Sequence, residues 1–263
     1  MNSPTPQLSE TPRDKLNRPL RDLRISVTDR CNFRCVYCMP KEIFDKDYAY
    51  LERTALLSFE EVTRLARVFQ RLGIEKIRLT GGEPLIRPDA ARIISGISSL
   101  RNQGLDELTL TTNGILVNEF LNDLKDAGVR SVNISLDTLL PERFASIAKR
   151  DRFHKVLSNI HLLLDHGFTV KVNMVVMKGV NDDEVIDFIT WTRDYPLHVR
   201  FIEFMPFSGN RWKDERLVRT GDLLERIKGF YDFMPLESRK HDTSRAFRVI
   251  GFSGTFAFIS TMS

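Results

Sequence analysis

The sequence is 263 residues long, which is enough for one large α/β domain or two small ones. Its 42% hydrophobic and 28% charged residues are typical of a globular protein, and no apolar run approaches the ~20 residues needed to span a bilayer. The net charge of +4 is spread over interspersed acids and bases without a Lys/Arg run, so we expect neither a nucleic acid nor a membrane as a partner.

The N-terminal segment, residues 1–20, is polar, contains prolines and lacks the apolar stretch of a secretory signal. We expect it to be a flexible tail that leads into the first strand. The three cysteines of the chain are clustered and form no disulfide framework, which indicates a reducing, cytoplasmic setting.

The next part of the chain repeats one local pattern, in which a helix ends in a glycine and a short β-branched strand follows. The four glycines are Gly73, Gly104, Gly128 and Gly167. Each stands where the position after a helix needs a positive φ. With Leu23–Thr28 before these units and His198–Phe204 after them, we count six βα units, which predict a parallel sheet with right-handed crossovers. An open, doubly wound sheet and a partly closed barrel both remain at this point.

Two helix starts carry the pattern of a capping box, in which the first side chain and one three residues later bond each other's backbone. One pair is Ser58 and Glu61, and the other is Asn181 and Glu184. We therefore expect helices to begin at both places.

Apolar and polar side chains alternate in five of the predicted strands. The apolar residues include Leu23, Ile25, Ile77, Leu79, Leu108, Leu110, Val132, Ile134, Val170 and Val172. The polar residues include Arg24, Ser26, Arg78, Thr80, Thr109, Thr111, Asn133, Ser135, Lys171 and Asn173. Parallel strands buried on both faces are usually apolar throughout, so we expect helices on one face and a polar, ligand-filled interior on the other. A curved, partly closed barrel fits this pattern better than an open sheet, and its interior cations need anionic partners.

All three cysteines follow the first strand with C-x3-C-x2-C spacing, as Cys31, Cys35 and Cys38. Iron–sulfur clusters are usually held by four thiolates, so three would leave one iron open to a ligand from outside the protein. A structural zinc ion would need a fourth Cys or His ligand, and the nearest histidine in sequence is the distant His154. An odd number of cysteines also leaves one thiol outside any disulfide. The spacing predicts an iron–sulfur cluster, with zinc as the alternative.

The second strand ends in Thr80-Gly81-Gly82-Glu83-Pro84, one strand away from the cysteine loop. Backbone without side chains can approach a ligand closely, and Glu83 could accept a hydrogen bond from an ammonium group. Active sites of β/α barrels are built from such loops at the carboxyl ends of the strands.

The cysteine motif, the Gly-Gly-Glu-Pro turn and the six βα units together resemble the radical S-adenosylmethionine superfamily. The resemblance implies a partial (β/α)6 barrel of parallel strands and two cofactors, a [4Fe-4S] cluster and S-adenosylmethionine. In that superfamily the open iron binds the amino and carboxylate groups of S-adenosylmethionine, and an electron splits the sulfonium to give a 5′-deoxyadenosyl radical. The cofactors supply this chemistry, and the protein supplies ligation and orientation.

Longer segments resemble, within that superfamily, the GTP cyclase family of molybdenum-cofactor biosynthesis. The segments are residues 21–35, 76–87, 111–114, 133–137, 171–173 and 200–205. By this resemblance the cluster is held by Cys31, Cys35 and Cys38. The residues that contact S-adenosylmethionine are Tyr37, Gly82, Ser135 and Met205. The residues that contact GTP are Arg24, Arg78, Thr111 and Lys171, of which three are the cations that the strand alternation places in the interior.

The family reaction removes the 3′ hydrogen of the GTP ribose, after which the carbon radical attacks C8 of guanine, so the chain is expected to be a lyase. The resemblance implies GTP and an electron-donor protein as partners and allows a homodimer. It does not identify a further catalytic residue.

The chain departs from the family pattern after the barrel, because the family carries a second C-x2-C…C cluster and this sequence has no fourth cysteine. We expect the barrel to span residues 21–210, and residues 211–263 to form an incomplete extension with a helix at Thr220–Gly229 and a hairpin of Ala246–Val249 with Thr255–Ile259. The chain should then cleave S-adenosylmethionine and convert GTP poorly. The alternatives are a non-catalytic remnant that binds a nucleotide or a partner, and a radical enzyme with another substrate.

Overall fold

The computed structural model of the chain describes residues 11–206, 210, 213–237 and 244–261. Residues 1–10 of the expected tail lie outside the described residues, and residues 11–20 form a turn closed by a 2.6 Å ion pair between Asp14 and Arg18. The chain divides into two compact units, each considered by itself. Unit 1 comprises Met1–Asn32, Tyr50–Thr112 and Leu116–Val132, and unit 2 comprises Phe33–Ala49, Asn113–Ile115 and Asn133–Ser263.

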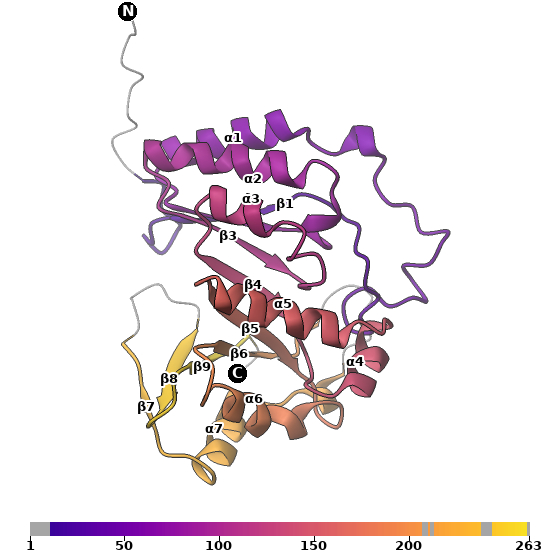
Figure 1. The fold of residues 1–263 in the computed structure, drawn as a ribbon, viewed down its shortest axis with the longest axis vertical. Helices are drawn as coiled ribbons and strands as arrows, with labels where there is room; N and C mark the ends of the chain where they lie inside the picture. Colours follow the sequence, from indigo (N-terminus) through magenta and orange to yellow (C-terminus); the bar gives the residue numbers. More distant parts are fainter. Residues whose placement is uncertain (1–10, 207–209, 211–212, 238–243, 262–263) are drawn as a thin grey trace, which may run out of the picture. The chain divides into compact units, whose positions relative to one another are not determined.

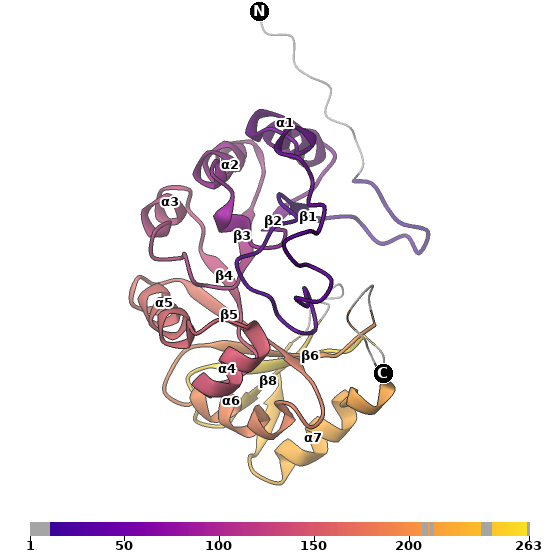
Figure 2. The ribbon, with the colours of Figure 1, turned by 90° about the vertical axis from the view of Figure 1, so that its right-hand side faces the viewer.

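Unit 1 is built on three parallel strands in the order β1–β2–β3, with three α-helices. The strands are β1 (Asp22–Ser26), β2 (Lys76–Thr80) and β3 (Glu107–Thr112), and the helices are α1 (Phe59–Arg71), α2 (Ala90–Ser98) and α3 (Leu121–Asp126). Short 3-10 helices are η1 (Arg53–Ala55), η2 (Pro84–Ile86) and η3 (Ser99–Gln103). The three α-helices lie along one face of the strands (Figure 1; Figure 2).

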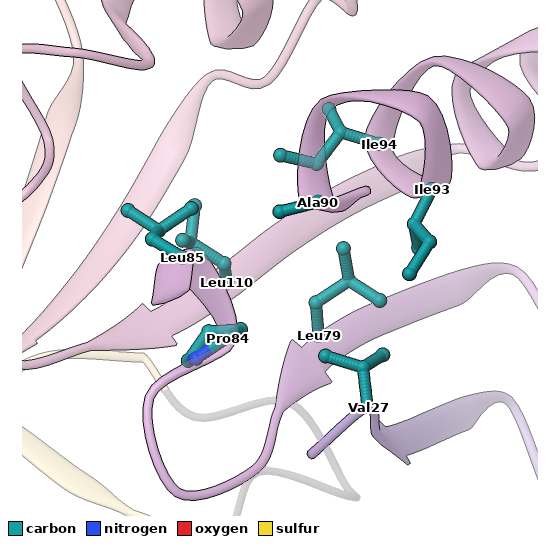
Figure 3. Close-up of a pocket in the computed structure, with 8 residues that line it drawn as sticks. All are labelled: Val27, Leu79, Pro84, Leu85, Ala90, Ile93, Ile94 and Leu110. Atoms are coloured by element: carbon teal, nitrogen blue, oxygen red, sulfur yellow. The ribbon is translucent and has the colours of Figure 1, made fainter. Parts of the chain in front are cut away.

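The side-chain alternation predicted for unit 1 is confirmed in β1 and β2, whereas in β3 the polar Thr109 is buried together with its apolar neighbours. Ile77, Leu79, Leu108 and Leu110 are buried, whereas the polar residues of β1 and β2 are exposed or half-buried. Figure 3 shows how η2 and α2 contribute Leu85, Ile93 and Ile94 to the apolar side chains of this core. The gap between these side chains is only ≈10 Å³ and has no polar lining, so it is a packing defect and not a binding site.

Unit 2 contains the remaining strands, and the division between the units falls within β4. Its strands are β4 (Ser131–Ser135), β5 (Thr169–Val176), β6 (His198–Glu203), β7 (Phe233–Pro235), β8 (Arg245–Val249) and β9 (Thr255–Ile259). Its helices are α4 (Pro141–Ala148), α5 (Phe153–Asp165), α6 (Val185–Trp191) and α7 (Thr220–Lys228), with 3-10 helices η4 (Asp182–Glu184) and η5 (Asp214–Arg216). The helix α5 packs beside β5 (Figure 2).

The C-terminal strands of unit 2 extend its sheet. The predicted hairpin is confirmed as the antiparallel pair β8 and β9, and β7 joins β8 on its other side. β9 also runs parallel to β6, with His198 opposite Thr255 and Arg200 opposite Ala257. The hairpin therefore continues the parallel sheet that β5 and β6 begin.

Local signals in the sequence account for several helix ends. Ser58 and Glu61 form the predicted capping box at the start of α1, with hydrogen bonds of 3.2 and 2.8 Å. The four junction glycines all have positive φ, between 62° and 107°. In the described part of the chain, every helix is too short or too polar to cross a lipid bilayer.

Candidate functional site

The first cysteine of the motif, Cys31, follows β1 in unit 1 and is held by the Gly-Gly-Glu turn. The amide of Gly82 donates to the Thr28 carbonyl at 2.8 Å, and the amide of Glu83 donates to the Arg30 carbonyl at 2.8 Å. A Cβ atom on Gly82 would stand 2.1 Å from the Arg30 carbonyl oxygen and 3.1 Å from the Cys31 nitrogen. Gly82 is thus needed for the backbone contact that positions Cys31.

The carboxylate of Glu83 is buried inside unit 1 and stabilises this turn. Its Oε1 accepts hydrogen bonds from the Thr112 hydroxyl at 2.7 Å and from the Leu85 amide at 3.1 Å. Glu83 therefore fixes the turn by contacts within the protein, a function that the motif alone did not indicate.

The other two cysteines lie in unit 2, on a turn that is bonded to the end of α4. The amide of Cys38 donates to the Cys35 carbonyl at 3.0 Å, and the amides of Arg34 and Val36 donate to the carbonyls of Ala148 and Ile147, each at 3.0 Å. These carbonyls belong to the last turn of α4, where helix carbonyls lack partners within the helix. The turn that carries Cys35 is thereby anchored to a regular element.

None of the three thiols is in a disulfide in the described part of the chain, and Cys38 is exposed. Among the described residues, no three side chains of His, Cys, Asp or Glu are arranged as a ready-made metal site. The soft donors of the sequence are three thiols that follow one another within eight residues. Three soft thiolates fit an iron–sulfur cluster with one open iron.

Tyr37, which lies between Cys35 and Cys38, is hydrogen-bonded to a buried carboxylate. Its hydroxyl donates to Oδ2 of Asp137 at 2.8 Å, and the Val175 amide donates to Oδ1 of Asp137 at 2.9 Å. Asp137 thus connects the cysteine loop to β5. The sequence analysis did not select Asp137, although it follows the predicted strand end at Ser135 by two residues.

Burial controls the protonation of this pair. It raises the pKa of Asp137 to about 6, against the opposing hydrogen bonds from Val175 and Tyr37. It also raises the pKa of Tyr37 well above 10, with the charges of Asp137 and Cys35 adding to the effect. Tyr37 therefore remains a hydrogen-bond donor at neutral pH.

A small cavity of ≈30 Å³ in unit 2 brings together three of the predicted site residues, Cys35, Tyr37 and Ser135. Asn113, Asp137 and Thr138 add polar groups, and Phe33 and Phe144 close it with aromatic rings. Drug-sized ligands occupy pockets of roughly 300–1,000 Å³, so this cavity can hold only part of a cofactor.

The second predicted capping box is wrong, because its two side chains instead hold the loop after β4. The side-chain amide of Asn181 donates to the carbonyls of Asp137 and Val175 at 2.8 and 2.9 Å. The carboxylate of Glu184 accepts from the Thr138 hydroxyl at 2.5 Å and from the Leu139 amide at 2.6 Å. These long-range hydrogen bonds form in place of the local cap, and they position the residues beside Tyr37.

Two predicted GTP contacts, Arg24 and Arg78, stand opposite each other on β1 and β2 of unit 1, with Thr109 next in the row. The Nε atom of Arg78 is buried and has no hydrogen-bond partner among the described residues. Burial, together with the charge of Arg24, lowers the pKa of Arg78. Two adjacent guanidinium groups with an unused donor form a site that an anion would stabilise. Thr111 lies two residues further along β3 than Thr109.

The fourth predicted GTP contact, Lys171, stands opposite His198 in unit 2. The next polar row pairs Asn173 with Arg200, whose guanidinium donates to the Asn133 side chain. Burial and the charges of Arg200 and Lys171 lower the pKa of His198 to about 4, so its ring is neutral at physiological pH. The sequence analysis missed Arg200, and extending the polar alternation to the sixth strand would have found it.

Lys171 and His198 line a hollow of ≈430 Å³ at the amino ends of β5, β6 and β9. Arg248 adds a further cation, and Glu237 and Thr255 contribute oxygen atoms. The polar row of unit 2 thus ends in a concave, mainly cationic surface.

Met205, the last predicted S-adenosylmethionine contact, lies just beyond β6 and is 36% exposed. Asn210 donates to its carbonyl at 2.8 Å. Two residues earlier, the buried carboxylate of Glu203 accepts from the amides of Thr220 and Thr261, both at 2.9 Å. The end of β6 is therefore fixed by the start of α7 and by the segment after β9.

The sequence of the chain is similar to those of several known proteins. A model of the radical SAM superfamily matches residues 25–192. A Bos taurus molybdenum cofactor biosynthesis protein 1 is 44% identical over 252 residues, which cover 95% of this chain and 39% of that protein. A GTP 3′,8-cyclase from Staphylococcus carnosus is 43% identical over 253 residues, which cover 95% of this chain and 74% of the cyclase. The chain thus spans less than half of the length of the animal relative.

Solved structures share the fold at low sequence identity. Streptococcus suis SuiB bound to S-adenosylmethionine gives a TM-score of 0.66 at 16% identity, covering 80% of this chain and 47% of SuiB. The enzyme anSMEcpe with bound AdoMet gives 0.61 at 17% identity, covering 81% and 61%. The predicted α/β fold with a parallel sheet is confirmed, and the likeness to these structures supports its partial-barrel form.

Proposed function

Because the chain belongs to the radical SAM superfamily and, within it, to the GTP 3′,8-cyclase family, we propose that it acts in the cyclisation of GTP during molybdenum-cofactor biosynthesis. The reaction would remove the 3′ hydrogen of the ribose and join that carbon to C8 of guanine. The observation that carries this proposal is the pair of facing guanidinium groups, Arg24 and Arg78, on the polar face of a parallel sheet whose first strand leads into the cysteine motif.

Cys31, Cys35 and Cys38 are the ligands that we propose for one [4Fe-4S] cluster. When bound, the cluster and S-adenosylmethionine supply the reductive cleavage of the sulfonium that starts the reaction. The backbone contacts of Gly82 hold the segment before Cys31, and those of Arg34 and Val36 hold the turn that carries Cys35.

S-adenosylmethionine would be held by Tyr37, Gly82, Ser135 and Met205. Tyr37 is kept in place by its hydrogen bond to Asp137. Ser135 lies at the end of β4 and shares a cavity with Tyr37 and Cys35. Gly82 lies directly against the Arg30 backbone, so it would offer the cofactor its own backbone and no side chain.

GTP would be held through its phosphates by Arg24, Arg78 and Lys171, with Thr111 as an uncharged contact. The Nε–H group of Arg78, which has no hydrogen-bond partner among the described residues, supports a bidentate contact to a phosphate group. In unit 2, His198 stands opposite Lys171 and is neutral, so it adds no positive charge to that row of polar residues. The polar face thus combines cations with groups that can donate hydrogen bonds without charge.

The remaining partners follow from the same chemistry. The cleavage needs one electron, so we include an electron-donor protein, and three thiols outside any disulfide fit a cytoplasmic, reducing setting. Exposed apolar residues on α1, Leu65, Val68 and Phe69, are compatible with a homodimer.

Anaerobic reconstitution of the chain with iron and sulfide tests the proposal. We expect about four irons per chain and release of 5′-deoxyadenosine when dithionite and S-adenosylmethionine are added. With GTP deuterated at the ribose 3′ position, deuterium should enter the 5′-deoxyadenosine. Tight binding of a single zinc ion with no iron, or deoxyadenosine that never acquires deuterium from GTP, would contradict the proposal.

A further inference from the structure

A hollow of ≈600 Å³ opens on the surface of unit 2 beside the cysteine loop. Its walls come from the loop after Cys38 and from the end of α4 with the residues that follow. The lining residues are Arg34, Lys41, Glu42, Phe44, Asp45, Lys46, Ala145, Lys149, Arg150 and Asp151. None of these residues belongs to the binding machinery described above.

The backbone explains why the two walls lie together. The amides of Arg34 and Val36 bond the last carbonyls of α4, and Cys35 stands between these two residues. Lys149 then ends α4 in the left-handed conformation, with φ 54° and ψ 34°. The hollow is therefore attached directly to the segment that carries a cluster ligand.

The lining is mainly cationic, with five Lys or Arg side chains against three Asp or Glu side chains. A helix C-terminus favours cations, which accounts for Lys149 and Arg150 locally. It does not account for Lys41 and Lys46, which come from a different segment. In the described part of the chain, the ammonium groups of Lys41, Lys46 and Lys149 take part in no ion pair.

The same loop also exposes apolar groups and a thiol. Val36 is 37% exposed, Ile43 is 39% exposed, and Cys38 is exposed as well. Protein interfaces combine apolar contacts with a polar rim, and a charged rim steers a partner of opposite sign.

We propose that this hollow is the docking surface for an acidic one-electron carrier protein that reduces the cluster. The inference rests on the proposed function, since only a redox cofactor on the cysteine loop needs such a partner. A flavin carrier would supply the electron by oxidation of its anionic hydroquinone to the neutral semiquinone. The cluster held by the three cysteines would take up that single electron, with no bond formed and no proton moved.

The expected interaction is transient and dependent on salt. Electron-transfer complexes bury less than roughly 1,200 Å², and their association is accelerated by complementary charge. Screening acts over about 8 Å at physiological ionic strength, so added salt should weaken binding. Carrier concentration and salt are therefore the variables to change.

The test uses the reconstituted chain and a purified flavodoxin as the acidic carrier. The variant carries Lys41→Glu, Lys46→Glu and Lys149→Glu, and its matched control carries Arg at the same three positions. A second control reverses charge outside the hollow, with Arg64→Glu on α1 and Lys125→Glu on α3, both exposed. Two quantities are measured: the affinity for oxidised flavodoxin by calorimetry, and the KM for its hydroquinone in deoxyadenosine formation.

We expect the glutamate variant to raise both the dissociation constant and the KM by about tenfold or more at low salt, within the range of electrostatic steering. The difference should shrink at high salt, and both controls should behave like the unaltered chain. Dithionite should drive the same reaction equally in all four proteins.

Equal affinity and KM in the glutamate variant would overturn the docking surface, and so would equal losses in the second control. Absence of reaction with dithionite in the unaltered chain would instead contradict the proposed function. In that case the calorimetric titration still decides whether the hollow binds the carrier.

Discussion

The two units each carry some of the proposed site residues, and they fix them by different means. In unit 1 the backbone is in close contact, with the Gly-Gly-Glu turn pressed against the peptide before Cys31. In unit 2 buried side chains form the connections, with Asp137, Asn181 and Glu184 joining the loop after β4 to its neighbours. Backbone contact tolerates no added atom, whereas a side-chain network fails when one partner is removed.

The largest effect is expected from Gly82→Val in unit 1. The new side chain would overlap the Arg30 carbonyl and displace Cys31, at a cost of about 3 kcal/mol or more. Reconstituted protein should lose most of its iron and its deoxyadenosine release. Gly221→Ala on α7 is the matched control, because a Cβ there meets nothing within 4 Å. Normal iron content in Gly82→Val would show that the contact is not needed.

In unit 2, Glu184→Ala should destabilise the protein by about 3 kcal/mol, because it removes the buried acceptor of Thr138 and Leu139. Arg143 bonds both Glu184, which is 3% exposed, and Asp183, which is 61% exposed. Asp183→Ala therefore serves as the control and should cost under about 1 kcal/mol. Urea unfolding measures both values, and equal losses would refute the role assigned to the buried network.

Arg78→Gln separates binding from stability in unit 1. Loss of one charge-assisted contact should weaken GTP binding by about 1.5–3 kcal/mol, or roughly 10- to 150-fold. The unfolding free energy should stay the same or rise, because the variant relieves repulsion between Arg24 and Arg78. Arg21→Gln is the control, since Arg21 makes only an exposed 3.4 Å pair with Glu75. Unchanged GTP affinity in Arg78→Gln would favour another substrate.

The effect that is smallest at neutral pH concerns His198 in unit 2, whose pKa falls from 6.5 to about 4 on folding. Between these values the unfolded chain binds a proton that the folded chain does not, so stability falls as the pH is lowered through this window. The loss is at most about 3 kcal/mol. His198→Asn should lose less stability between pH 7 and pH 4.5 in urea unfolding. Parallel pH profiles would contradict the buried, neutral state of His198.

The features predicted correctly from the sequence are local ones. The positive-φ glycines and the Ser58–Glu61 cap each depend on residues close together in the chain. The alternation in β1 and β2 also needs only neighbouring residues.

The features that were missed depend on distant partners. Asn181 and Glu184 have the spacing of a cap, but they bond residues near position 138, more than forty residues earlier. The same holds for the pairing of Asp137 with Tyr37 and of β6 with β9. Such contacts follow from the packing of elements, which local patterns do not determine.

The most direct test of the central claim is electron paramagnetic resonance of the reconstituted and reduced chain, recorded with and without S-adenosylmethionine. If Cys31, Cys35 and Cys38 leave one iron open, the cofactor should bind that iron and change the spectrum. Replacing any one of the three cysteines with serine should remove the signal. A cluster spectrum that S-adenosylmethionine leaves unchanged would contradict the account.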